Sequence, residues 1–184
     1  METLCLVVLG LLAACWPAVS PLPTGAPLTS CESMAPKHTD VTPQTGPAPY
    51  YIMIKNYTDK VEVTVMGRSY SGILLEARYP NQTMAVGTWA QPPANTKQIA
   101  CFNKMNSAIT HSNTELKTNV TYTWISSCSK NGTIVFLATV AESRTIYWIK
   151  LTSDPVRVTC SGSAINLHGF AALVVLLISA VAVL

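Results

Sequence analysis

The chain has 184 residues, carries a formal net charge of +3 at pH 7, and has only 11% charged residues. This length allows one domain of ordinary size, and a hydrophobic content of 49% is too high for a disordered chain. The basic residues are spread along the sequence and form no cluster, which argues against nucleic-acid binding.

The first part of the chain has the composition of a secretory signal peptide. Residues 4–16 are continuously apolar, which suits the central region of such a peptide but is short for a bilayer span. We therefore expect residues 1–20 to be a signal peptide, with cleavage nearer Ala14 or Cys15 as an alternative, and residues 21–30 to be a Pro-rich N-terminal segment. An N-terminal membrane anchor is the competing interpretation.

The C-terminal end carries a second processing signal. Residues 171–184 are apolar apart from one serine, and no Lys or Arg follows them to fix a transmembrane helix. Small residues and a short polar spacer precede this tail, the order typical of a glycosylphosphatidylinositol attachment signal. We expect residues 161–184 to be this signal, with lipid attachment at Ser161 or, alternatively, at Gly162 or Ser163. A single membrane-spanning helix is the competing interpretation.

Cysteines indicate an oxidising compartment. Of six cysteines, Cys5 and Cys15 fall within the expected signal peptide, which leaves an even number in the mature chain. Secreted chains with an even number of cysteines commonly form disulfides, so we predict two, for which three pairings are open. The cysteines concerned are Cys31, Cys101, Cys128 and Cys160. A zinc site is disfavoured because no Cys-x-x-Cys pair occurs and the histidines are far apart.

Asparagine sequons support the same compartment. Four Asn-x-Thr triplets without a central proline lie between the two processing signals. Because a glycan must project into solvent, each of these asparagines is expected at the surface of a glycoprotein. They are Asn56, Asn81, Asn119 and Asn131.

The middle of the chain has the pattern of an all-β domain. Val61, Val63 and Val65 alternate with polar residues, as in a half-buried strand. A later alternating run places Leu116 on the core face of a second strand and Lys117 on its solvent face. About eight short strands separated by turn residues predict an antiparallel two-sheet sandwich. Its expected core is Val61, Val63, Leu75, Val120, Tyr122, Trp124, Phe136, Ala138 and Trp148.

Two local patterns add detail to this prediction. The sequence Lys-Asn-Gly at residues 130–132 is typical of a β-hairpin turn. Residues 101–109 have a weak helical pattern. No other stretch of the mature segment has convincing helical periodicity.

Catalytic motifs are nearly absent from the sequence. Ser127 and Lys130 satisfy a Ser-x-x-Lys pattern, but the companion motifs of that enzyme class are missing. His38 and His111 each lie within about ten residues of a cysteine and would begin a haem or metal site if the fold joined them. Hydrogen-bonded structural histidines are the favoured interpretation. We therefore predict no catalytic residues, metal or cofactor.

Residues 31–38, Cys-Glu-Ser-Met-Ala-Pro-Lys-His, resemble the opening of the reeler domain, the N-terminal module of reelin. In that family Met, Pro and His follow a cysteine at this spacing. Further similar blocks follow in order: Gly-Ile-Leu-Leu-Glu-Ala-Arg at 72–78, Val-Gly-Thr-Trp at 86–89, Cys101, Ala-Ile-Thr-His at 108–111, Trp124, residues 135–140 and Tyr-Trp at 147–148. Residues 31–160 are therefore expected to form a reeler domain.

This resemblance implies an immunoglobulin-like antiparallel β-sandwich with the disulfides Cys31–Cys101 and Cys128–Cys160. Reeler domains occur in matrix and guidance proteins, in ferric-chelate reductases and in small insect defence proteins. The reductases owe their chemistry to additional domains for which this chain has no room, so the resemblance implies no enzyme activity.

Two functional hypotheses follow. The first is a glycosylated, lipid-anchored binding or adhesion module at the extracellular face of the plasma membrane, with an extracellular protein or glycan as its partner. The alternative is a secreted or surface innate-immune defence protein resembling the insect proteins. Haem or metal binding is a more remote possibility, and a nucleic-acid partner is not expected.

Overall fold

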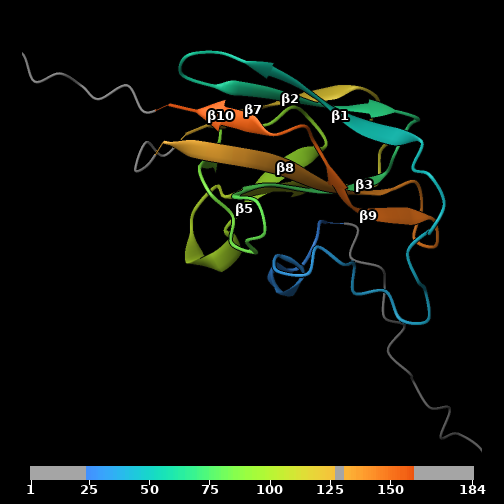
Figure 1. The fold of residues 1–184 in the computed structure, drawn as a ribbon. Helices are drawn as coiled ribbons and strands as arrows, with labels where there is room; N and C mark the ends of the chain where they lie inside the picture. Colours follow the sequence, from blue (N-terminus) through green and yellow to red (C-terminus); the bar gives the residue numbers. More distant parts are fainter. Residues whose placement is uncertain (1–23, 127–130, 160–184) are drawn as a thin grey trace, which may run out of the picture.

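The computed structural model describes residues 24–126 and 131–159, which fold into two packed antiparallel β-sheets (Figure 1). Within this part of the chain, no helix has the length and hydropathy needed to cross a bilayer. Several predicted features lie outside the described residues: the signal peptide, the C-terminal tail, Cys128, Cys160, Ser161, Gly162 and Ser163.

The two sheets contain four and six strands. The first has the order β1-β2-β7-β4, with β1 Tyr50–Asn56, β2 Val61–Gly67, β7 Val120–Ile125 and β4 Thr88–Trp89. The second has the order β10-β8-β3-β6-β5, with β9 also paired to β8. Its bounds are β10 Val156–Val158, β8 Gly132–Ala141, β3 Gly72–Arg78, β6 Ala108–His111, β5 Thr96–Ile99 and β9 Tyr147–Thr152. The all-β sandwich prediction is confirmed.

The structure has ten strands where the sequence predicts about eight. β4 and β10 contain two and three residues, too few to show the alternation that identifies a strand in sequence. The helical pattern expected over residues 101–109 is also wrong in extent. Only a 3₁₀ turn forms there, η2 Cys101–Asn103, because Ala108 already begins β6. A second such turn is η1 Leu28–Ser30.

The inner faces of the two sheets enclose an apolar core. Trp89 and Trp124 of the first sheet meet Phe136 of the second edge to face, with ring centroids 5.8 and 5.6 Å apart. Such aromatic pairs stabilise a core beyond their buried area. Val120 and Trp148 are only half-buried, because Val120 opens β7 and Trp148 lies in the edge strand β9. The remaining predicted core residues are buried: Val61, Val63, Leu75, Tyr122, Trp124, Phe136 and Ala138.

The predicted orientation of Leu116 and Lys117 is wrong. Leu116 is 69% exposed and Lys117 only 3% exposed. Both precede the start of β7, and Lys117 instead forms an isolated bridge with Tyr70. Its ammonium donates hydrogen bonds to backbone carbonyls, including that of Ser71 at 2.9 Å. Alternation misleads here because Leu116 and Lys117 precede the paired residues of β7. Burial also lowers the pKa of the Lys117 ammonium.

The hairpin predicted at residues 130–132 does not exist. β7 pairs with β2 and β4 in the first sheet, whereas β8 pairs with β3, β9 and β10 in the second. β7 and β8, which flank the predicted turn, therefore belong to different sheets and do not pair with each other. A turn signal specifies a change of direction, but the pairing partner is decided by the tertiary structure.

β3 is buried along its whole length, unlike an ordinary strand of a two-layer sandwich. Its inner face contributes Ile73, Leu75 and Ala77 to the main core. Its outer face is covered by a second apolar cluster that contains Leu74 and residues from the N-terminal end of the domain. A third, partial layer therefore lies on the outside of the six-stranded sheet.

Candidate binding pocket beneath the N-terminal arm

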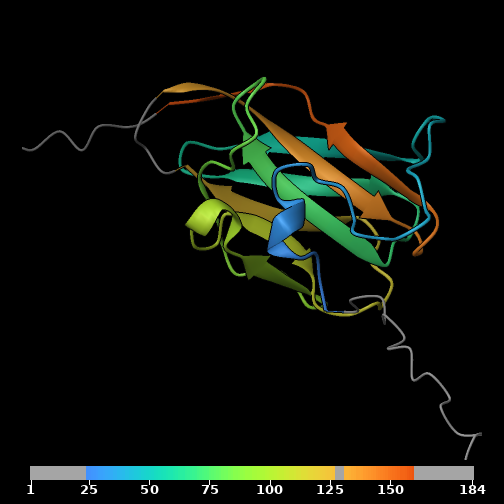
Figure 2. The same ribbon diagram turned by 90° about the horizontal axis from the view of Figure 1, so that it is seen from below.

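The third layer is an N-terminal arm, defined here as residues 24–44. Figure 2 shows this arm, drawn in blue, lying across the face of the sheet that contains β3 and β8. Pro27, Pro36 and Pro43 interrupt it, and proline lacks the N–H that a sheet ladder requires. The arm therefore contains no strand and is held by other contacts.

A disulfide fixes the middle of the arm to the sheet. Cys31 in the arm is bonded to Cys101 in η2, with a Cα–Cα distance of 5.7 Å and a sequence separation of 70. This is the first of the two pairings that the reeler resemblance implies. Both cysteines belong to the second apolar cluster, together with Met34 of the arm.

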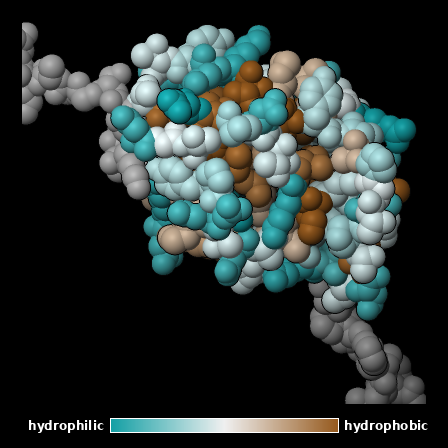
Figure 3. Space-filling view, in the orientation of Figure 1, coloured by the Kyte–Doolittle hydropathy of each residue, from teal (hydrophilic) through white to brown (hydrophobic). Residues whose placement is uncertain are grey.

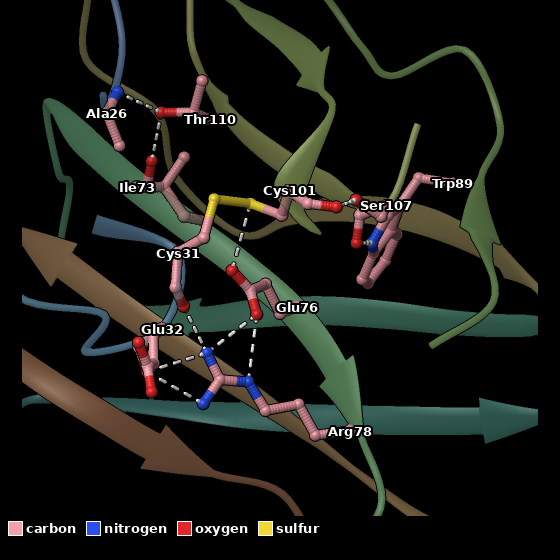
Figure 4. Close-up of a disulfide and its surroundings, with 10 residues drawn as sticks. All are labelled: Ala26, Cys31, Glu32, Ile73, Glu76, Arg78, Trp89, Cys101, Ser107 and Thr110. Atoms are coloured by element: carbon pink, nitrogen blue, oxygen red, sulfur yellow. Dashed lines mark hydrogen bonds and ion pairs between the residues drawn. A yellow bond between two sulfur atoms is a disulfide. The ribbon is translucent and has the colours of Figure 1, made fainter. Parts of the chain in front are cut away.

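Beneath the disulfide, Arg78 joins the arm to β3 (Figure 4). Its guanidinium donates hydrogen bonds to the backbone carbonyls of Cys31 and Glu32. The same group forms an ion pair of 2.8 Å with Glu76. Glu76 and Arg78 are 0% and 2% exposed, so the pair is fully desolvated. Both terminal nitrogens of the arginine therefore hold the arm.

Glu76 also lies against the disulfide, with one carboxyl oxygen 3.3 Å from Sγ of Cys101. Burial raises the pKa of Glu76 to about 7, against the opposing effect of Arg78. A disulfide sulfur carries no proton, so this contact is a hydrogen bond only when protonated Glu76 donates it. Cys31, Glu76 and Cys101 lie close enough to suggest metal ligation, but their sulfurs are joined to each other and hold no thiolate.

The start of the arm approaches the sheet very closely. The amide of Ala26 donates to Oγ1 of Thr110 at 2.8 Å, and that hydroxyl donates to the carbonyl of Ile73 at 2.8 Å. Gly25 has φ +117°, and a Cβ there would lie 2.7 Å from the carbonyl oxygen of His111. Glycine is therefore required where the arm meets β6.

The second half of the arm is held from β8 and from the turn that follows it. The hydroxyl of Thr139 donates to the carbonyl of Met34 at 2.6 Å. Nδ1 of His38 lies 2.7 Å from the carbonyl of Arg144. Because a carbonyl only accepts hydrogen bonds, Nδ1 carries the proton. The ring of Tyr147 packs edge-on against His38 with centroids 5.8 Å apart.

Between these attachment points the arm and the sheet enclose a pocket of about 260 Å³. The side chain of Ser30 lines it, is 1% exposed, and has no hydrogen-bond partner for its hydroxyl within the described residues. Lys37 and Arg144 also line it and are exposed, so they lie where it meets solvent. The apolar part of the lining comes from Ala26, Pro27, Met34, Ala35, Pro36, Ile73, Leu74 and Ala141.

The structure brings His38 and His111 to the lining of this same pocket. Nδ1 of His111 accepts a hydrogen bond from the amide of Ile73 at 3.3 Å, and His38 is bonded as described above. Both rings therefore serve structural hydrogen bonds. A cavity of about 150 Å³ holds one benzene, so 260 Å³ is too small to enclose a porphyrin.

The described lining of the pocket is mainly apolar, with basic side chains where it meets solvent. Its described lining contains no cysteine and no Asp or Glu side chain, so it lacks a carboxylate base or thiol nucleophile. The Ser-x-x-Lys pattern lies in a segment outside the described residues. The geometry is that of a ligand-binding cavity with an apolar body and a basic mouth.

The four sequon asparagines lie away from this pocket. Asn56, Asn81, Asn119 and Asn131 are all exposed, as a glycan requires, and none of them lines the cavity. Sequence reasoning did not single out Ser30, Glu76 or Arg78. Glu76 and Arg78 fall within the block at 72–78 that carries the family resemblance, but the roles of all three residues arise only when the arm folds over β3.

Two antiparallel sheets with a disulfide-anchored arm over one outer face define the class of this protein as an all-β sandwich. Residues 29–163 match the Reeler domain family. The chain therefore belongs to the reeler domain family.

Relatives in this family include proteins of different architecture. A protein of Antheraea mylitta named "Putative defense protein 2" is 36% identical over 151 residues, covering 76% of this chain and 92% of that relative. Ferric-chelate reductase 1 of Bos taurus is 33% identical over 140 residues, covering 72% of this chain but only 23% of the reductase. The shared part is thus nearly the whole of the first relative and a minor part of the second.

The fold is also found in a solved structure. The human F-spondin reeler domain superimposes with a TM-score of 0.52 at 17% identity, covering 65% of this chain and 95% of that domain. At this identity the likeness supports the fold alone. It agrees with the family assignment made from the sequence match.

Proposed function

We propose that the mature chain is a glycosylated, lipid-anchored reeler domain at the extracellular face of the plasma membrane, where it binds a ligand and catalyses no reaction. Its partner would be an extracellular ligand, such as an adhesion protein or a glycan. The disulfide and the exposed sequons support an extracellular position.

The observation that carries the proposal is the position of the pocket relative to the expected anchor. β10, the last strand before the C-terminal tail, pairs with β8 at residues 132–134. The pocket is lined by Thr139 and Ala141 near the other end of β8. At about 3.3 Å per residue, the two ends of the ten-residue strand β8 are separated by roughly 30 Å. A lipid attached after β10 would therefore leave the pocket facing away from the membrane.

The surface supports binding at a pocket more than at a broad apolar face. Figure 3 shows apolar residues near the centre of the drawn face, with hydrophilic residues between them. Adhesion through a flat interface would favour a continuous apolar patch with a polar rim. The concave site beneath the arm, with its converging polar groups, is therefore a better candidate than the face drawn in Figure 3.

The anchor is tested by treating intact animal cells that express the full chain with a phospholipase specific for phosphatidylinositol. We expect release of the protein, and mass spectrometry after deglycosylation should find its C-terminus at Ser161, Gly162 or Ser163. Retention with the complete tail would instead indicate a membrane-spanning helix. Secretion without the enzyme would also contradict the anchor and leave a soluble binding protein.

A second candidate function is host defence, favoured by the relative from Antheraea mylitta, which this chain matches over 92% of its length. Lys37 and Lys55 are exposed and would favour anionic surfaces, whereas Lys60 is paired with Glu62 at 3.3 Å. Defence predicts slower bacterial growth at micromolar protein and weaker binding to bacteria after Lys37→Gln and Lys55→Gln. Unchanged growth and unchanged binding would oppose this function.

A further inference from the structure

We propose that the pocket beneath the arm binds a small amphiphilic carboxylic acid, with its carboxylate at Lys37 and Arg144 and a hydrogen-bonding group at Ser30. This inference rests on the proposed binding function and names the class of ligand for its site. It is argued from the size, charge and polarity of the pocket.

The size of the pocket limits the ligand. A cavity of about 150 Å³ accommodates the six carbon atoms of benzene. By proportion, a pocket of 260 Å³ encloses roughly ten non-hydrogen atoms. The apolar walls from Met34, Leu74 and Ala141 favour an aromatic ring or a short alkyl chain as the enclosed body.

The charge at the mouth selects the sign of the ligand. Lys37 and Arg144 lie there, and no Asp or Glu side chain is among the described lining residues. His38 also lines the pocket, and its Nδ1–H is committed to the Arg144 carbonyl. A carboxylate is therefore favoured over an amine at this end.

Ser30 indicates a polar group at the other end of the ligand. Its hydroxyl is buried in the lining and lacks a hydrogen-bond partner among the residues the structure describes. Ser30 is 1% exposed, whereas Lys37 and Arg144 are exposed, so Ser30 marks the buried end of the pocket and the basic residues mark its solvent end. A buried hydroxyl without a partner is costly, so a ligand that supplies one gains affinity. An apolar body with a hydroxyl opposite its carboxylate satisfies both ends.

Three probes of similar size test this assignment. Para-hydroxyphenylpropionate carries both polar ends, phenylpropionate lacks the hydroxyl, and tyramine replaces the carboxylate by an ammonium. The protein is purified from animal cells expressing the full chain, and binding is measured by calorimetry. We expect the hydroxylated acid to bind best, phenylpropionate about fivefold more weakly, and tyramine at least about tenfold more weakly.

Variants assign the binding to the pocket. Ser30→Ala should lower the affinity for the hydroxylated acid about fivefold and change the affinity for phenylpropionate less than about twofold. Lys37→Glu with Arg144→Glu should lower the affinity for both acids about tenfold and raise the affinity for tyramine. The control, Lys55→Glu with Arg68→Glu, makes the same change of charge at exposed residues outside the pocket lining and should leave all three affinities unchanged.

Ala35→Trp is a further variant that fills the pocket and should abolish binding. Circular dichroism and thermal unfolding check that each variant is folded, and the exposed charge variants keep the test valid if Ala35→Trp does not fold. The proposal is overturned if no acid binds saturably, or if folded pocket variants bind like the wild type. Equal losses for both acids in Ser30→Ala would overturn the placement of the hydroxyl. The phospholipase experiment is independent of these outcomes, so failure of the ligand class is distinguishable from failure of the anchor.

Discussion

Glu76 and Arg78, two positions apart on the outer face of β3, form an ion pair of 2.8 Å directly beneath the Cys31–Cys101 disulfide. Arg78 makes two kinds of contact: it donates a hydrogen bond to the Glu76 carboxylate, and it donates to backbone carbonyls of the arm. Removing either member leaves buried polar groups without partners. The stability of the arm, and with it the pocket, therefore depends on this pair.

Arg78→Met should be among the most destabilising substitutions of a polar residue in this domain. It leaves the carbonyls of Cys31 and Glu32 and the carboxyl of Glu76 without their donor. We expect the free energy of unfolding to fall by about 3 to 5 kcal/mol, measured by urea denaturation. The double variant Glu76→Leu with Arg78→Met should recover part of this loss, because it also removes the buried carboxyl group that Arg78→Met leaves without its donor.

The matched control is Arg157→Met, since Arg157 is exposed. Its effect should stay within about 0.5 kcal/mol. Similar losses for the two arginine variants would contradict the anchoring role of Arg78. Hydrogen exchange of the arm should separate the two further, because only Arg78→Met loosens residues near Cys31.

The free energy of unfolding should decrease as pH rises, because of Glu76. Its pKa is raised to about 7 by burial, so the folded state holds a proton that the unfolded state has released. Stability from this group is complete below the unfolded pKa of about 4.5 and is lost as pH rises through 7. Between pH 5 and 8 we expect a loss on the order of 2 kcal/mol.

Glu76→Gln tests this pH dependence because its side chain cannot ionise. The variant should be close to the wild type at pH 5 and should lack the decline toward pH 8, as measured by urea denaturation at each pH. Glu62→Gln is the control, since Glu62 makes only surface contacts, an ion pair with Lys60 and a hydrogen bond accepted from the Tyr57 hydroxyl. A wild-type decline that persists in Glu76→Gln would assign it to another group.

The sequence predicts the sandwich well and the third layer poorly. Alternation identifies strands such as β2, in which Val61, Val63 and Val65 face the core. In contrast, β3 has no alternation to detect because both faces are buried. The run from Ile73 to Leu75 thus indicates burial but does not say that Glu76 and Arg78 are buried with it.

The pocket depends on contacts between distant parts of the chain. Ala26 and Thr110 are 84 positions apart, and Met34 and Thr139 are 105 apart. Local propensity contains no information on such pairings. The resemblance to the reeler family supplied the Cys31–Cys101 pairing, which places His38 and His111 on one side of the sheet, but neither pattern nor resemblance identified the cavity between them.

Removal of the disulfide should loosen the arm. For Cys31→Ala with Cys101→Ala, the separation of 70 residues gives a loss of about 4 kcal/mol in the chain-entropy treatment. Urea denaturation measures the loss, and limited proteolysis should find new cleavage within residues 24–44. A reducing agent should destabilise this variant further if Cys128 and Cys160 form the second disulfide. Unchanged proteolysis of the arm would show that the hydrogen bonds of Arg78 and Thr110 are sufficient to hold the arm without the disulfide.

Glycosylation should occupy the exposed sequons, and each replacement of Asn by Gln should remove the mass of one glycan. Asn119→Gln should also lower the free energy of unfolding by about 1 kcal/mol, because its Oδ1 accepts a hydrogen bond from the amide of Gly67 at 3.2 Å. The residue has φ 52°, a conformation that asparagine tolerates better than glutamine does. Thr58→Ala is the control, since it removes the sequon at Asn56 and leaves the asparagine in place. Mass spectrometry before and after peptide N-glycosidase counts the glycans, and a variant whose mass changes only by its substitution marks an unoccupied site.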